Sequence, residues 1–203
     1  MQNAFTAVTP DYRPWGDAIP AALGTKGTAL TDAGHPVEVW QPNAGIPAKY
    51  RYWCHGHATF SYWLHGFSIF SNADMETVLS DEWVRVDKKP IVGDIIVFRA
   101  DADGVGYASG AILHTARVES AAHHFGGRTN INVSSKNGTA KLKLASTPAE
   151  VLGVYNDCHW FKTEQACCCS TKRIDKQYYR RLDRTVAQGT FVAWATRNMD
   201  RLR

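Results

Sequence analysis

The sequence predicts an α+β fold, in which a helix packs on an antiparallel sheet that follows it in the chain. Length and composition allow one sizeable core, because 44% of the 203 residues are hydrophobic. The apolar pattern is helical between residues 54 and 83, alternates over several short segments after that, and becomes helical again near the C-terminus. Helices and strands are therefore expected in separate parts of the chain, with no internal repeat.

The first half of the chain predicts loops followed by helices. Residues 1–49 are rich in proline and glycine and predict loops with short extended pieces. Residues 54–67 predict a helix, because apolar side chains recur there at the spacing i, i+4, i+7. The side chains of this stripe are Phe60, Leu64 and Phe67. A second, short helix is expected over residues 74–83.

The second half predicts strands and then helices. Four segments rich in β-branched or alternating residues are expected to be strands: 91–98, 110–120, 130–138 and 150–156. Two helices are expected from residue 172 onward, separated by Gly189. We therefore predict a catalytic domain over residues 1–156 and a basic helical extension over residues 157–203 that packs on the same domain.

Charge and hydropathy limit the cellular role. The net charge is +4, and residues 170–203 carry nine of the Lys and Arg residues against three Asp. A basic tail can meet an anionic polymer or an acidic partner, but it is most often a solvated helix face. No signal peptide and no apolar run of the length of a membrane helix is visible. We expect a protein made in the cytoplasm, with no insertion into membranes.

Cys54 and His114 are the residues that best suit nucleophilic chemistry. Cys54 lies where the helical pattern begins, and a helix N-terminus beside a histidine favours the thiolate. His114 lies in the middle of a predicted strand, from which it could serve as a base. A third polar group should orient its imidazole, and Asn132 or Ser134 on the next strand could do so. Cys167–Cys169 and Cys158 match no zinc spacing, so no metal or cofactor is expected.

The order of these motifs resembles the NlpC-type papain-like cysteine peptidases. The matching segments are Cys54-His55-Gly56-His57-Ala58, then residues 90–98, then His114-Thr115-Ala116-Arg117-Val118, then Val133-Ser134-Ser135. The resemblance covers residues 48–156 and implies a papain-like core. Two departures stand at the nucleophile: His55 replaces the usual serine, and Trp53 replaces the usual acidic residue.

The resemblance also implies roles for individual residues. Cys54 would be the nucleophile and His114 the general base, with the third position at Asn132 or Ser134. Tyr50 or Tyr52 would line the substrate site. His55 would contact the substrate or compete with His114 as a base.

The implied activity is hydrolysis of amide bonds in peptidoglycan stem peptides through a thioacyl-enzyme. A basic chain of this size without a signal peptide is similar to interbacterial amidase toxins delivered by type VI secretion. A secretion-machine carrier and an immunity protein are then expected partners, and the target-cell periplasm is the expected site of action. We expect a monomer with no nucleic-acid partner.

Other interpretations use some of the same residues. His55-x-His57 and His123-His124, with the basic tail, faintly suggest a metal-dependent nuclease toxin. A non-catalytic binding module could share the fold, because fold does not fix function. An acyltransferase or a protein deamidase would use the residues of the amidase.

Overall fold

The computed structural model describes residues 1, 5–12, 24–87, 89–101, 103, 108–124, 129–138, 140–153 and 174–182. They fall into two compact units, which we describe separately. The first unit comprises Met1–Val84, Lys136–Leu142 and Arg181–Ala187, and the second comprises Arg85–Ser135, Lys143–Arg180 and Gln188–Arg203. Both contain sheets with antiparallel pairing, so the predicted α+β class is confirmed. Cys158, Cys167–Cys169 and the predicted helices after residue 182 lie outside the described residues.

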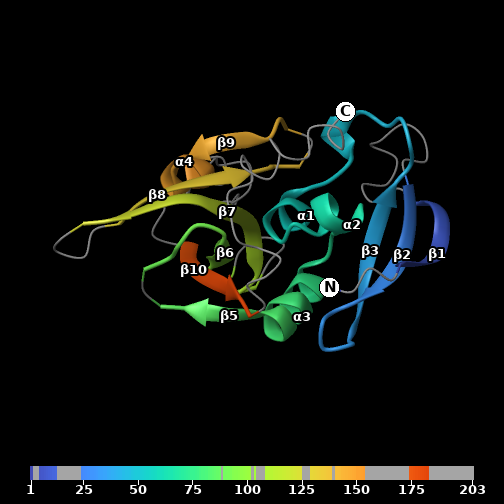
Figure 1. Ribbon diagram of the computed structural model, residues 1–203, viewed down its shortest axis with the longest axis horizontal. Helices are drawn as coiled ribbons and strands as arrows, with labels where there is room; N and C mark the ends of the chain where they lie inside the picture. Colours follow the sequence, from blue (N-terminus) through green and yellow to red (C-terminus); the bar gives the residue numbers. More distant parts are fainter. Residues whose placement is uncertain are drawn as a thin grey trace. The chain divides into compact units, whose positions relative to one another are not determined.

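The first unit contains a four-stranded antiparallel sheet in the order β1-β2-β3-β4, of which Figure 1 shows β1, β2 and β3 side by side. Its strands are β1 (Phe5–Tyr12), β2 (Gly24–Leu30), β3 (Pro36–Pro42) and β4 (Ser68–Ile69). Loops with short extended pieces were predicted over residues 1–49, and the extended pieces are three strands of seven or eight residues that pair in one sheet. Several of the glycines and prolines that suggested loops stand at strand ends, where they leave the ladder intact.

The helix predicted over residues 54–67 is two helices, α1 (Cys54–Ala58) and α2 (Ser61–His65). The break is at Phe60, whose φ of 64° lies in the left-handed region, and Gly66 ends α2 with a φ of 80°. A 3-10 turn, η2 (Ala48–Tyr50), precedes α1. The next helix, α3 (Asn72–Glu82), agrees with the helix predicted over 74–83, but Ser71 caps it by accepting from the backbone N–H of Asp74.

Close packing and aromatic side chains fix α1 in the first unit. A Cβ on Gly56 would overlap the side chain of Ser68 in β4, so only glycine allows this approach. Trp53, just before α1, packs on Trp40 of β3 with ring centroids 5.1 Å apart. Ile46, Tyr50 and Phe70 complete this cluster. The residue before the candidate nucleophile is thus held by the core.

The second unit is built on a six-stranded sheet in the order β5-β10-β6-β7-β8-β9. The strands are β5 (Trp83–Val86), of which Arg85 and Val86 belong to this unit, β10 (Ile174–Arg181), β6 (Ile95–Ala100), β7 (Ile112–His123), β8 (Thr129–Ser135) and β9 (Lys143–Ser146). The helix α4 (Pro148–Gly153) supplies Val151 and Leu152 to the core beneath it. Figure 1 shows α4 beside β8 and β9.

Two predicted elements of the second unit have the wrong type. Residues 150–156 were expected to be a strand, but Val151 and Leu152 lie on α4 and are both buried. Residues 174–181 were expected to be helical, but they form β10, which pairs with β6. Pairing with the buried strand β6 determines the structure of residues 174–181, because tertiary contacts override a weak helix propensity. The predicted helical extension is therefore a strand over its described part.

Gly93 and Asp94 form the turn that leads into β6. Gly93 has a φ of 93°, and a carboxylate oxygen of Asp94 accepts from the backbone N–H of Ile91 at 2.8 Å. Arg180 of β10 donates twice to the same carboxylate, at 2.9 Å from each nitrogen. This ion pair fastens the β10 strand to the turn before β6. No helix in the described part of the chain is long and apolar enough to cross a membrane.

Candidate functional site

Cys54 is the first residue of α1 and is half-buried. Its sulfur lies 3.7 Å from Nδ1 of the next residue, His55. The contact is within hydrogen-bonding range for sulfur. The two neighbours in sequence therefore form a thiol–imidazole pair inside the first unit.

Asn72, the first residue of α3, contacts the second nitrogen of this imidazole. Its Oδ1 lies 3.2 Å from Nε2 of His55. With the amide assigned in this orientation, Oδ1 can only accept, so Nε2 of His55 must carry a proton. Nδ1 is then left to exchange a proton with the sulfur of Cys54. Asn72 thus selects the tautomer in which His55 can act as a base towards Cys54.

The electrostatics around His55 favour its charged form. Burial opposes the charge on His55, but the Cys54 thiolate, the hydrogen bonds to Cys54 and Asn72, and the nearby Glu76 raise its pKa above the usual value. The His55 side chain is 5% exposed, and both ring nitrogens have partners. The predicted role as a substrate contact has little surface available. The alternative role as a base agrees with the geometry.

His57, the second histidine of the motif, is in a different position. It is fully buried, and the indole N–H of Trp63 donates to its Nδ1 at 3.1 Å. An indole nitrogen only donates, so Nδ1 of His57 must accept and the ring carries its proton on Nε2. A protonated His57 could not keep this bond. His57 therefore serves the packing of α2 on α1.

The two candidate substrate-lining tyrosines belong to the core. Tyr52 is 7% exposed and stacks on Tyr62, with ring centroids 4.7 Å apart. Burial raises the pKa of its phenol. Tyr50 packs against the Trp40–Trp53 cluster. Tyr52 has almost no surface for a ligand, whereas Tyr50 is partly exposed.

Lys136 is a buried cation of the first unit that sequence reasoning missed. It follows β8 directly and is 2% exposed. Its ammonium donates to the backbone carbonyls of Lys49 at 3.0 Å and Gly138 at 2.6 Å, and it lies 5.2 Å from the ring centroid of Tyr52. Lysine is rarely buried this far, so the position requires an explanation. No local pattern could have indicated it, because two of its contacts, with Lys49 and Tyr52, are distant in sequence.

In the second unit, His114 lies on β7 and is 1% exposed. It pairs with Phe98 of β6, and their rings stack with centroids 6.0 Å apart. Regular pairing continues to Arg117, opposite Ile95. Since side chains alternate along a strand, His114 and Arg117 point to opposite faces of the sheet.

The sheet register does not bring either proposed third residue to His114. Ser134 pairs with Arg117 and so lies on the face opposite to His114. Its hydroxyl donates to the carboxylate of Glu119 at 2.6 Å, at a bulge in β7. Asn132 pairs with Ser120, six residues along β7 from His114, which is roughly 20 Å. A catalytic role for Asn132 or Ser134 stays a prediction, and the register, which depends on a bulge, favours neither of them as the partner of His114.

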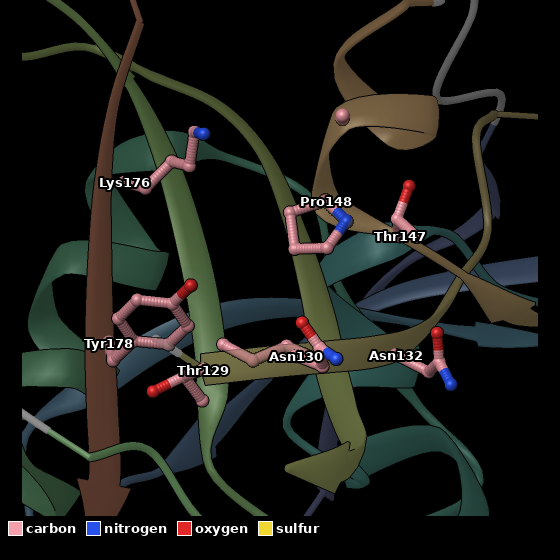
Figure 2. A pocket seen from close by; sticks show the side chains of 9 residues that line it. Thr129, Asn130, Asn132, Thr147, Pro148, Lys176 and Tyr178 are labelled. Atoms are coloured by element: carbon pink, nitrogen blue, oxygen red, sulfur yellow. The ribbon is translucent and has the colours of Figure 1, made fainter. Parts of the chain in front are cut away.

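Asn132 instead lines a cavity of about 610 Å³ in the second unit. Figure 2 shows Asn130 and Asn132 on β8, and Lys176 and Tyr178 on β10. Thr129, Ile131, Thr147, Pro148 and Ala149 complete the lining, and none of these nine residues is acidic. Asn130 and Thr129 already contact His124 and His123. The cavity is lined by both polar and apolar side chains, but neither Cys54 nor His114 is among them.

Among the described ranges, no group of three or more His, Cys, Asp or Glu side chains is placed to hold a metal ion. Of the residues that suggested a nuclease, His55 contacts Cys54 and Asn72 in the first unit, and His124 contacts Asn130 in the second.

Comparison with protein-family models, with curated proteins and with solved structures found no match to this chain.

Proposed function

We propose that this protein is a cysteine amidohydrolase with Cys54 as its nucleophile. The observation that carries the proposal is the series of contacts from the Cys54 sulfur to His55 and from His55 to Asn72. A thiol that can pass its proton to a fixed imidazole becomes nucleophilic at neutral pH. The resemblance of the motif order to NlpC-type peptidases supplies the substrate class, the amide bonds of peptidoglycan stem peptides.

In the proposed reaction, the sulfur of Cys54 attacks the amide carbonyl carbon after its proton has moved to an imidazole. The carbon–nitrogen bond then breaks, and the amine leaves with that proton. Water attacks the resulting thioester, so that a carbon–oxygen bond forms, the carbon–sulfur bond breaks and the thiol is restored. His55 is the imidazole that the contacts favour for the first proton transfer. The role of His114 as general base stays a prediction.

A biological setting follows from the same resemblance. An amidase of this kind would be an antibacterial toxin effector that acts in the periplasm of a target cell. It would require a carrier from a secretion machine, such as type VI, and an immunity protein in the producing cell. Monomeric function and the absence of a nucleic-acid partner belong to this proposal.

Digestion of purified peptidoglycan tests the activity directly. Wild-type protein should release muropeptide fragments with new amino and carboxyl ends, detected by liquid chromatography and mass spectrometry. Cys54→Ala should abolish release, and His55→Gln and His114→Ala measure the share of each imidazole. Cys158→Ala is the matched control for loss of a thiol and should retain activity. Cleavage that survives Cys54→Ala would refute the proposal.

The same experiment separates the alternatives. Peptidoglycan that binds without being cut would favour a binding module. Cutting of nucleic acid that a chelator stops and Cys54→Ala does not change would favour a nuclease. New amide bonds to an added amine, in place of free carboxylates, would favour an acyltransferase.

A further inference from the structure

The buried ammonium of Lys136 has no carboxylate partner among the described residues. It contacts two backbone carbonyls, of Lys49 and Gly138, and the face of the Tyr52 ring. Carbonyl oxygens and an aromatic face attract a cation but carry no full negative charge. A lysine is buried in such surroundings at a cost in desolvation. The arrangement therefore holds a cation for which the described residues supply no permanent counter-charge.

The ammonium lies over the ring of Tyr52, two residues before Cys54 at the start of α1, so the nearest candidate for a counter-charge is the Cys54 thiolate. Burial lowers the pKa of Lys136 to about 8, and the Cys54 thiolate opposes that change. Electrostatic coupling is reciprocal, so a thiolate that favours the ammonium is favoured by it to the same extent. Tyr52, the other titratable group at the ammonium, stays neutral because burial raises the pKa of its phenol.

We propose that Lys136 is a positioning residue of the active site, whose buried ammonium stabilises the Cys54 thiolate. The ammonium is fixed by two hydrogen bonds, so its charge does not reorganise when the thiol ionises. Lys136 and His55 have different roles in this proposal. His55 receives the proton of the thiol, whereas Lys136 contributes only a positive charge. The proposal rests on the proposed function in one respect, that Cys54 is the nucleophile.

Alkylation of Cys54 by iodoacetamide tests this proposal without peptidoglycan. The thiolate displaces iodide and forms a thioether, so the rate measures the thiolate fraction. Cleavage after Arg51 and Arg85 by trypsin gives a peptide that contains Cys54 as its one cysteine, and mass spectrometry then follows that site alone. Rates are measured from pH 5 to pH 10.

Lys136→Met should move the midpoint of the pH profile upward by about one unit, which is about a tenfold loss of rate below the midpoint. Lys136→Arg keeps the charge and should stay close to wild type. Lys49→Met removes an exposed lysine of the first unit as a matched control, since only the backbone carbonyl of Lys49 contacts Lys136. A folded Lys136→Met protein with the wild-type profile would overturn the proposal.

A second measurement covers the case in which Lys136→Met fails to fold. The pKa of Lys136 is measured by NMR on protein labelled at the lysine ε-carbons, in wild type and in Cys54→Ser. Loss of the thiolate should lower the pKa of Lys136, and an unchanged pKa would refute the coupling. Coupling without peptidoglycan cleavage would uphold this inference and refute the proposed function. Peptidoglycan cleavage that depends on Cys54, with no coupling between Cys54 and Lys136, would uphold the proposed function and refute this inference.

Discussion

Oδ1 of Asn72 lies 3.2 Å from Nε2 of His55, on the side of the ring away from Cys54. The two residues belong to different helices, α3 and α1, and are 17 positions apart. Their contact gives the histidine next to the thiol a fixed tautomer. It also identifies the helix that begins at Asn72 as part of the site rather than as packing alone.

Substitution of Asn72 should change the pH dependence of hydrolysis. The hydrogen bond to Asn72 helps to raise the pKa of His55, so the imidazolium persists to a higher pH than usual. Asn72→Ala should therefore move the high-pH limb of kcat/KM downward and lower its maximum about tenfold, because the tautomer is no longer fixed. Asn72→Asp should move that limb upward. Profiles equal to those of the exposed-site control Asn43→Ala would show that Asn72 does not act on His55.

His57 should matter for stability and little for the chemistry. His57→Leu leaves the indole N–H of Trp63 without the acceptor it has in the native protein, at a cost of about 1–3 kcal/mol in the free energy of unfolding. His57→Gln offers a replacement acceptor and should lose less. Urea unfolding measures both. Alkylation of Cys54 in the folded protein should keep the wild-type pH profile, and a shifted profile would place His57 in the site.

Ser134→Ala tests the prediction that Ser134 is the third catalytic residue. The buried carboxylate of Glu119 would lose a donor at 2.6 Å, which should cost about 1–3 kcal/mol of stability. The variant should keep kcat/KM below its melting temperature, because Ser134 lies on the sheet face opposite to His114. Exposed Asn132→Ala should change neither quantity. A large fall in kcat/KM for Ser134→Ala, without loss of fold, would restore it as a catalytic candidate.

Lys136 should also make stability depend on pH in alkaline solution. Its pKa is about 8 in the folded state and about 10.5 when unfolded, so the unfolded chain binds more protons between these values. Stability relative to Lys136→Met should therefore rise as the pH increases from 8 to 10.5, by at most about 3 kcal/mol. Both proteins are unfolded in the Cys54→Ser background, so that titration of the Cys54 thiol does not contribute to the difference. A difference that stays constant with pH would mean that Lys136 is not desolvated.

Much of the second unit could be predicted from local pattern. Strands near 91–98, 110–120 and 130–138 are found as β6, β7 and β8, because β-branched alternation reports burial on one face. The sheet face on which each side chain lies could not be predicted. The bulge at Glu119 shifts the register between β7 and β8, and nothing in the sequence marks it. The element type of residues 174–181 was missed because pairing with β6 decides it.

The candidate site likewise combines residues that the sequence indicates with residues that it does not. Cys54 and His55 could be named from the sequence, because they are adjacent and stand at a helix start. Asn72 and Lys136 could not, because each reaches the site through tertiary packing. The break at Phe60 was also invisible, since a non-glycine residue with positive φ carries no sequence signal.

The break at Phe60 limits what α1 can do alone. The helix has five residues, so few aligned peptide dipoles point at the sulfur. Side chains from outside α1, Asn72 and Lys136, would have to supply the rest. The segment Cys54–Ala58 grafted into another scaffold should therefore behave as an ordinary thiol, with neither fast alkylation nor hydrolysis at neutral pH. Transplanting the reactivity would require the start of α3 and the turn after β8 together with the cysteine.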